Sequence, residues 1–355
     1  MMQSLPEPDI SAKVAFLRRP EAFPDAPDSV SVIETHFAWV FLSRRYVYKL
    51  KKPVRFQGVD LTTREARRAN CELEIALNRR LAAETYIGVV ALGRQGARLR
   101  LECNENPADW LVKMHRLSPD HTLDHVLPSM DPDDPRLARL LDKLCGFYGR
   151  TARAPWDASE YTKSLKNQII RYASELAKPE LALDHAPVNN IVARQMRFID
   201  DNRALFESRI AHGRVVDAHG DLRPEHVFLT DNPQIIDCLE FSAELRQLDT
   251  AEEISFLALE CERLGRPAIG ERLRGLYMER CKDDIPLRLF DFYGSRRALI
   301  RAFLSAWHLR EHPHENVAHR WLEQARWYIA TARSSIMRAS HAVIRADAST
   351  DRRPA

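Results

Sequence analysis

The 355-residue chain lacks the long apolar runs and the strong charge excess that mark membrane-spanning and nucleic-acid-binding proteins. No run of about 18 apolar residues occurs, so we expect no membrane span. The opening residues lack the apolar segment of a signal peptide. The formal net charge is only +3, with basic and acidic residues interleaved, which disfavours nucleic acid as the main partner. We therefore expect a soluble, cytoplasmic protein.

Cysteine pairs and glycine clusters are also absent. The six cysteines contain no C-x-x-C pair, which disfavours a zinc ribbon or a redox dithiol, and a chain of this length does not suggest a disulfide scaffold. No glycine lies between Asp28 and Tyr46, and no G-x-x-x-x-G-K-[ST] motif occurs anywhere in the sequence. We therefore expect neither a glycine-rich phosphate loop in the early strands nor a P-loop ATPase domain.

Hydrophobic patterning predicts an α+β protein with two lobes. Residues 1–28 carry five prolines and predict an irregular leader with at most one short helix. Residues 29–116 are rich in strand patterns and predict a small β-rich N-lobe, whereas 117–335 predict a larger, mostly helical C-lobe. Residues 336–355 predict a disordered tail. A cleft between two lobes is a common place for a ligand.

The early part of the small lobe predicts a hairpin followed by a helix. "THFAWVFLSRRYVYKLKKP" contains two aromatic and β-branched runs, and Pro53 ends the second. Thr62 or Thr63 is placed to cap the helix that follows. Its apolar positions recur at four-residue spacing and are Ala69, Leu73, Leu77 and Leu81.

The stretch "VVDAHGDLRPEHVFLTDNPQIIDCLEF" (215–241) has the pattern of a phosphoryl-transfer site. Asp221 is the candidate base in a tight loop that Gly220 permits. The strand-like runs "HVFL" and "QIID" flank a turn and predict a short hairpin. That hairpin would bring Asp237 back beside His226. Two acids and a histidine around one metal would suit transfer from a nucleotide.

The small lobe supplies a candidate phosphate-binding cation. Strand alternation in "YVYKLKK" places Val47, Lys49 and Lys51 on one face. Glu74 shares the inward face of the following helix with Leu77 and Leu81, so it could pair with Lys49. Spacing alone leaves Lys51 and Glu72 open as substitutes for this pair.

These motifs resemble the aminoglycoside phosphotransferase-like, or choline-kinase-like, small-molecule kinases. "HGDLRPEHVFL…IIDCLEF" resembles the Brenner-type motif of that family. "THFAWVFLSRRYVYKLKKPVRF", "CELEIALNRRLAAETYIGVV" and "DCLEFSAELRQLDTAEEISFLALE" resemble an uncharacterised bacterial branch whose members sometimes carry an additional P-loop ATPase domain. The resemblance covers roughly residues 29–335 and implies a bilobal protein-kinase-like fold.

The resemblance also implies ATP as donor and Mg²⁺ as cofactor. It implies that Asp221 is the catalytic base, that Asp237 binds metal, and that His219 braces the catalytic loop. Lys49 and Glu74 become the phosphate-positioning pair, and Asp249 corresponds to an aspartate that supports the loop from the following helix.

His226 departs from the family pattern, which usually has an asparagine there. Because imidazole suits transition metals better than Mg²⁺, His226 favours Mn²⁺, hydrogen-bonds from outside the coordination shell, or marks a weakened enzyme. The weakened case would be a nucleotide-binding pseudokinase. A metal-dependent hydrolase is a further alternative, built on His219, Asp221, Glu225 and His226.

The sequence thus predicts an ATP-dependent phosphotransferase with an alcohol group of a small molecule as acceptor. It identifies neither the substrate nor the oligomeric state. Two basic features outside the motifs are expected to have ordinary roles. Arg297 and Arg301 could contact an anionic substrate, but surface charge or ion pairing is favoured; His312 and His314 predict an exposed loop.

Overall fold

The computed structural model describes residues 8–56, 59–96, 98–178, 181, 183–311 and 318–350. His312 and His314 therefore lie outside the described residues. The chain forms two compact units, named unit 1 (Met1–Val126 with Glu225–Leu245) and unit 2 (Leu127–Pro224 with Arg246–Ala355). The predicted α+β architecture is confirmed. Residues 225–245, which the sequence places in the second lobe, belong to unit 1 because β11 packs against α2 there.

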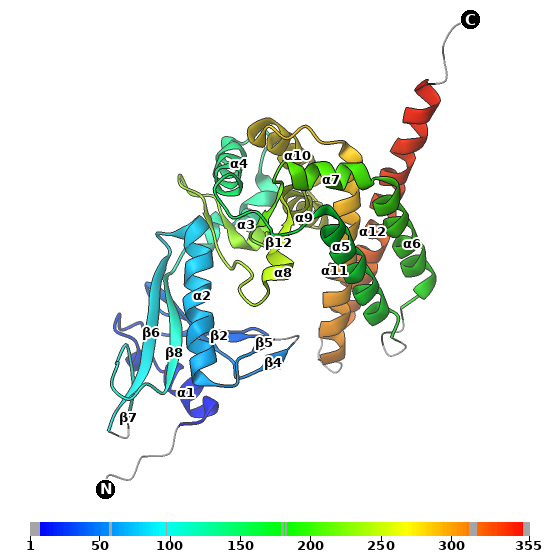
Figure 1. The fold of residues 1–355 in the computed structure, drawn as a ribbon. Helices are drawn as coiled ribbons and strands as arrows, with labels where there is room; N and C mark the ends of the chain where they lie inside the picture. Colours follow the sequence, from blue (N-terminus) through cyan, green and yellow to red (C-terminus); the bar gives the residue numbers. More distant parts are fainter. Residues whose placement is uncertain are drawn as a thin grey trace, which may run out of the picture. The chain divides into compact units, whose positions relative to one another are not determined.

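Unit 1 is built on a six-stranded antiparallel sheet (Figure 1). Its strands, in spatial order, are β1 (Ser31–Glu34), β2 (Ala38–Leu42), β3 (Tyr46–Lys51), β8 (Asp109–His115), β6 (Tyr86–Gln95) and β7 (Arg98–Leu101). Two small hairpins accompany it, β4 (Arg55–Phe56) with β5 (Val59–Asp60) and β10 (Val227–Phe228) with β11 (Gln234–Ile235). The predicted β2–β3 hairpin is confirmed, and Val40 pairs with Lys49.

Both faces of this sheet are covered. The helices of unit 1 are α1 (Ile10–Leu17), α2 (Arg64–Ala82) and α3 (Leu123–Val126), with 3-10 turns at Pro20–Ala22 and Pro119–His121. Leu17 and Phe23 pack with Tyr48 and Leu50 on one face. The predicted leader therefore contributes a helix and core residues, because its few apolar side chains cover a sheet face. On the opposite face α2 packs against β6 and β8 (Figure 1).

The burial of α2 corrects one prediction from its spacing. Thr63 caps the helix through a hydrogen bond from the Ala66 amide, as expected. Leu77 and Leu81 are buried, but Leu73 is 42% exposed. A four-residue step advances about 400° around a helix, so a strict four-residue repeat drifts off the buried face within two turns. Glu74 takes the inward position instead and is 1% exposed.

Unit 2 is mostly helical (Figure 1). Its helices are α4 (Pro135–Tyr148), α5 (Ala158–Leu176), α6 (His185–Asp201), α7 (Arg203–Ala211), α9 (Thr250–Arg263), α10 (Pro267–Cys281), α11 (Leu287–Glu311) and α12 (Ala318–Thr350). A two-stranded sheet pairs β9 (Val215–Asp217) with β12 (Gln247–Asp249). The boundary with unit 1 passes through α8 (Ala243–Arg246) and through a 3-10 turn at Pro224–His226; a further 3-10 turn is at Leu127–Ser129.

Two features of unit 2 differ from expectation. Helix α12 continues to Thr350, so residues 336–350 are helical rather than a disordered tail. At the start of this stretch, Ile336 and Ala339 are buried. Cys145 and Cys281 form a disulfide between α4 and α10. Their 136-residue separation leaves no local pattern from which the pair could be predicted.

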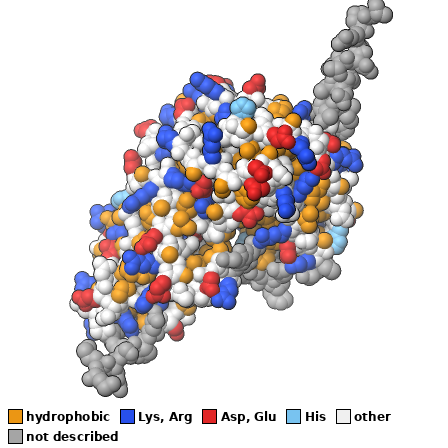
Figure 2. All heavy atoms as spheres, viewed as in Figure 1, with side chains coloured by type: hydrophobic (Ala, Val, Ile, Leu, Met, Phe, Trp, Pro, Cys, Tyr) orange, Lys and Arg blue, Asp and Glu red, His pale blue; other side chains and the backbone are white. Residues whose placement is uncertain are grey.

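Among the described residues, no helix combines the length and apolar character needed to cross a membrane. On the face shown in Figure 2, Lys and Arg side chains are interspersed with Asp and Glu. This mixed distribution agrees with the interleaving of charges along the sequence.

Candidate phosphotransfer site

Strand β3 and helix α2 bring two lysines to one glutamate. Lys49 Nζ lies 2.8 Å from Glu74 Oε1, and Lys51 Nζ lies 2.5 Å from Glu74 Oε2. The two lysines share a face of β3 because they are two residues apart, as alternation predicts. Glu72 pairs instead with Arg68 on the exposed side of α2. Spacing left open whether Lys49 or Lys51 pairs with Glu74, and the structure shows that Glu74 contacts both.

The β10–β11 hairpin brings Asp237 to the same place. Asp237 Oδ1 lies 2.5 Å from Lys49 Nζ, and Asp237 Oδ2 lies 3.5 Å from His226 Nε2. The Ile236 amide donates to the His226 carbonyl, which closes the hairpin. Lys49, Glu74, His226 and Asp237 thus form one cluster within unit 1, named the lysine–carboxylate cluster.

The backbone at Asp237 has an uncommon conformation. Its φ is +64°, in the left-handed region that few residues other than glycine adopt. Two contacts hold it: the Asp237 amide donates to the Tyr86 hydroxyl at 3.2 Å, and the Cys238 amide donates to Asn78 Oδ1 at 2.9 Å. Asn78 lies one helical turn after Glu74, so α2 holds Cys238 directly and is linked to Asp237 through Lys49. Such strain is typical of functional positions.

The charges in the cluster stabilise one another. Burial alone would lower the pKa of Lys49, but Asp237 and Glu74 outweigh it and raise the pKa well above its ordinary value. Burial would raise the pKa of Glu74, but the two lysines outweigh it and lower the pKa. Partial desolvation opposes the charge of Asp237, yet Lys49 holds its pKa well below the ordinary value. The Asp237 side chain is 49% exposed, so the carboxylate is accessible.

Glu240, which lies beside this cluster, has no counterpart in the sequence-based prediction. Lys51 Nζ lies 2.6 Å from Glu240 Oε1, in addition to its contact with Glu74. Glu240 follows Asp237 by three residues, so the segment after β11 contacts β3 at two points. The predicted hairpin places Glu240 near Asp237, but its partner Lys51 is 189 residues away in the sequence. No local pattern could therefore predict this pair.

The predicted catalytic loop lies in unit 2 directly after β9. His219 is fully buried, and its Nδ1 accepts a hydrogen bond from the Asp221 amide at 3.3 Å. Gly220 has φ +87°, so this tight loop requires glycine. Asp221 Oδ2 accepts from Arg223 Nε at 3.1 Å, and the Asp221 side chain is 25% exposed.

Glu253, from α9, holds this loop and is missing from the sequence-based prediction. Its carboxylate accepts from the His219 amide at 3.0 Å, from the Gly220 amide at 2.7 Å and from the Tyr148 hydroxyl at 2.9 Å. Burial raises the pKa of Glu253, and these donors offset only part of that effect. Its position four residues after Asp249 is the only sequence signal that could have suggested this role.

Asp249 supports the loop less directly than the resemblance implies. Its carboxylate accepts two hydrogen bonds from Arg209 and one from Tyr293, and it caps α9 at the Ala251 amide. Asp249 also pairs with Val215 across the β9–β12 sheet. It therefore fixes the strand that leads into the loop, whereas Glu253 contacts the loop itself.

Arg297 and Arg301 of α11 have buried partners. Arg297 Nε lies 2.7 Å from Glu252 Oε1, and its Nη1 donates to the Gly220 carbonyl at 3.2 Å. Arg301 Nε lies 3.6 Å from Glu260. Ion pairing is thus confirmed for both arginines, and Arg297 is 7% exposed.

Comparison with known proteins gives relatives in sequence and in structure. No protein-family model matches the chain. Over 279 residues, 77% of the chain, it is 32% identical to uncharacterised proteins of Mycobacterium bovis and Mycobacterium tuberculosis. The chain spans only 54% of those relatives.

Two solved structures share its architecture. A choline/ethanolamine kinase family protein from Mesorhizobium loti has a TM-score of 0.54 at 13% identity, covering 91% of this chain and 98% of its own. A GDP complex of an aminoglycoside 2'-phosphotransferase-IIIa mutant has a TM-score of 0.50 at 13% identity, covering 92% and 98%. The chain has the fold of the aminoglycoside phosphotransferase-like kinases. The predicted resemblance is confirmed at the level of the fold.

The donor set of this phosphotransferase fold suits a metal that a nucleotide brings. Among the described residues, no three His, Cys, Asp or Glu side chains are placed to hold a metal. Mg²⁺ bound with a nucleotide needs only one or two carboxylates besides phosphates and water. The accessible Asp237 carboxylate fits that requirement, with His226 as a neighbouring nitrogen donor.

Proposed function

We propose that the protein is an ATP-dependent phosphotransferase, a small-molecule kinase that transfers the γ-phosphate to a hydroxyl group. The observation that carries this proposal is the contact of Lys49 with both Glu74 and Asp237. The three residues come from a strand, a helix and a hairpin far apart in the sequence. A lysine fixed by a glutamate beside an accessible aspartate is the arrangement that phosphate and metal binding require.

Each residue of the cluster then has a distinct role. Lys49, fixed by Glu74, binds the phosphate oxygens through its positively charged ammonium group. Asp237 would hold a divalent metal, with His226 as its neighbour on the hairpin. Such a metal would supply positive charge that offsets the negative charge of the phosphates. Because Lys49 occupies Asp237 Oδ1, metal binding at Asp237 competes with this lysine. Lys51 and Glu240 keep Glu74 charged and in place.

Asp221 is the proposed base at the acceptor. The acceptor oxygen forms a bond to the γ-phosphorus while the bond from that phosphorus to the bridging oxygen breaks, and ADP leaves. The hydroxyl proton passes to Asp221. Arg223, which donates to Asp221 Oδ2 at 3.1 Å, stabilises the ionised carboxylate before transfer.

The test is phosphate transfer by the purified protein from ATP, with GTP in parallel because one structural neighbour was solved with GDP. A hydroxyl-compound library with Mg²⁺ or Mn²⁺ provides acceptors. Asp221→Asn should lower turnover by about 10² to 10⁴-fold and leave nucleotide affinity within about twofold. Asp231→Asn is the matched control and should keep full activity, because Asp231 lies in the exposed turn of the β10–β11 hairpin.

A nucleotide-binding pseudokinase is the second candidate. The observation that favours it is His226, which lies 3.5 Å from Asp237 where the family usually has a metal-binding asparagine. Nucleotide binding without transfer to any acceptor, in wild type as in Asp221→Asn, would favour this alternative and contradict the kinase proposal.

A further inference from the structure

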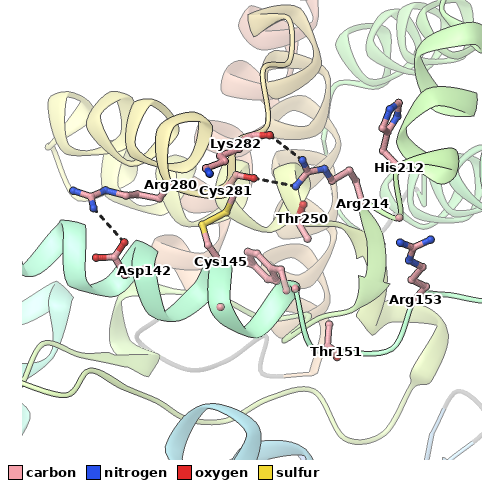
Figure 3. Close-up of a pocket in the computed structure, with 14 residues that line it drawn as sticks. Asp142, Cys145, Thr151, Arg153, His212, Arg214, Thr250, Arg280, Cys281 and Lys282 are labelled. Carbon is pink, nitrogen blue, oxygen red and sulfur yellow. Dashed lines mark hydrogen bonds and ion pairs between the residues drawn. A yellow bond between two sulfur atoms is a disulfide. The ribbon is translucent and has the colours of Figure 1, made fainter.

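Unit 2 contains a polar pocket that the proposed reaction does not use (Figure 3). Its volume is about 450 Å³. The walls come from the C-terminal half of α4, the end of α10, the residues that lead into β9 and the first residue of α9. The Cys145–Cys281 disulfide forms part of the wall and ties α4 to α10.

The charged side chains that line this pocket are mostly cationic. They are Arg153, Arg214, Arg280 and Lys282, with His212 beside them and Asp142 as the one carboxylate in the lining. Arg280 is 3.4 Å from Asp142, and Arg214 donates to the carbonyls of Cys281 and Lys282 (Figure 3). Within the described part of the chain, Arg153 and Lys282 have no carboxylate partner. The pocket therefore has uncompensated positive charge.

Lys282 occupies a position that normally favours glycine. It is the residue after α10, its φ is +49°, and its amide donates to the Met278 carbonyl. A left-handed residue at this point in a helix end is commonly glycine, which has no Cβ to strain the backbone. A lysine there is unfavourable for the cap alone. A ligand for its ammonium group gives the lysine a physical reason to occupy this position.

Arg153 is accommodated by a glycine. Gly213 has φ +65°, and a Cβ on it would lie 2.4 Å from Arg153 Nε. The missing side chain thus leaves room for the guanidinium group at the pocket wall. The backbone of Arg153 is fixed by a bridge to Val216 in β9. Arg153 is therefore anchored at its base, with an exposed cationic end.

We propose that this pocket binds a small organic phosphate through Arg153 and Lys282. A guanidinium and an ammonium group are the donors that recognise phosphate oxygens. The volume is in the range of small-molecule sites and exceeds what a single phosphate group fills, which favours a phosphorylated organic molecule over free phosphate. The site is distinct from the Asp221 loop, because His219, Gly220 and Asp221 are not among the residues that line the pocket.

Binding is tested by thermal shift of the full chain without nucleotide, metal or reductant. The probes are inorganic phosphate, pyrophosphate, glucose 6-phosphate and fructose 1,6-bisphosphate. At least one sugar phosphate should raise Tm in a dose-dependent manner that weakens with salt. Arg153→Gln and Lys282→Gly should each weaken the apparent affinity by on the order of tenfold. Arg203→Gln, an exposed charge on α7 outside the pocket, is the matched control and should respond like wild type.

Lys282→Gly also separates binding from folding. Glycine suits the left-handed backbone, so this variant should melt at the wild-type temperature or higher while losing the response to the probes. An equal response to inorganic phosphate alone would assign the site to the free anion instead of an organic phosphate. No response of wild type to any probe, or an unchanged response in both pocket variants, would overturn the proposal.

Discussion

The lysine–carboxylate cluster of unit 1 and the His219–Asp221 loop of unit 2 are held by different kinds of contact. In unit 1, Glu74 and Asp237 face lysine ammonium groups. In unit 2, Glu253 faces two backbone amides and a tyrosine hydroxyl, with no cation in direct contact among the described residues. One arrangement holds charged groups, which the proposed function assigns to an anionic nucleotide. The other fixes the shape of a loop.

This difference appears in the pKa values. Lysines lower the pKa of Glu74 and Asp237, whereas burial raises the pKa of Glu253. Backbone amides carry only partial charge, so they compensate less of the desolvation than an ammonium group does. The unit 1 cluster therefore depends on ionisation, and the unit 2 loop depends on hydrogen-bond geometry.

The largest expected effect is that of removing the shared carboxylate in unit 1. Glu74→Gln leaves Lys49 and Lys51 with less compensation in a buried site and should lower the free energy of unfolding by about 3–5 kcal/mol. Chemical denaturation measures this loss. Glu72→Gln, on the exposed side of the same helix, should change stability by less than about 0.5 kcal/mol. Equal effects of the two substitutions would show that the cluster contributes nothing to stability.

A slightly smaller effect is expected from truncating the carboxylate in unit 2. Glu253→Ala leaves the His219 and Gly220 amides without an acceptor and should cost about 2–4 kcal/mol. Glu262→Ala, at an exposed position of α9, is the control. Hydrogen exchange should show faster exchange at the Gly220 amide in Glu253→Ala. Unchanged exchange there would mean that Glu253 does not hold the loop.

The stabilising contributions of Glu74 in unit 1 and Glu253 in unit 2 should change with pH in opposite directions. Glu74 has a folded pKa below its ordinary value of 4.5, so its stabilising contribution is full above that value and is lost as pH falls. The Glu74→Gln penalty should therefore stay constant from pH 7 down to about pH 5 and shrink as the pH falls below 4.5. Glu253 has a folded pKa above 4.5, so its contribution is full at low pH and is lost as pH rises through the folded pKa.

The Glu253→Gln penalty should therefore be larger at pH 4 than at pH 7. A tenfold difference in proton affinity between the folded and unfolded states corresponds to about 1.4 kcal/mol of stability. Urea denaturation of the two variants and wild type from pH 7 down to about pH 3.5 measures both trends. Penalties that change in the same direction would contradict the difference between the two regions.

The smallest expected effect concerns metal preference. His226→Asn replaces a nitrogen donor next to Asp237 with an amide oxygen, which Mg²⁺ prefers. The ratio of Mg²⁺-supported to Mn²⁺-supported activity should rise by about tenfold or less. A loss of activity with both metals would indicate a site built around histidine.

Local patterns in the sequence were sufficient for the central part of the site. Alternation placed Lys49 and Lys51 on one face, helical periodicity placed Glu74 inward, and the hairpin returned Asp237 to His226. Each of these relations involves residues within a few positions of one another or neighbouring elements. The regular geometry of strands, helices and hairpins determines them.

Contacts between distant segments were not predictable in this way. The Lys51–Glu240 pair, the hold of Glu253 on Gly220 and the Cys145–Cys281 disulfide each join residues at least 33 positions apart. Tertiary packing determines which of the many glutamates and cysteines forms each of these contacts. The exposed Leu73 shows the same limit, because a four-residue repeat alone did not reveal which positions of α2 would be buried.

Calorimetric titration of ATP, with and without Mn²⁺ or Mg²⁺, tests most directly whether the lysine–carboxylate cluster binds a nucleotide and its metal. Wild type and Asp231→Asn should bind ATP more tightly with metal than without it. Asp237→Asn should lose most of the metal-dependent gain, about tenfold or more in Kd, while metal-free binding persists through Lys49. Metal-dependent binding that is unchanged in Asp237→Asn, or no nucleotide binding by wild type under any condition, would contradict the account.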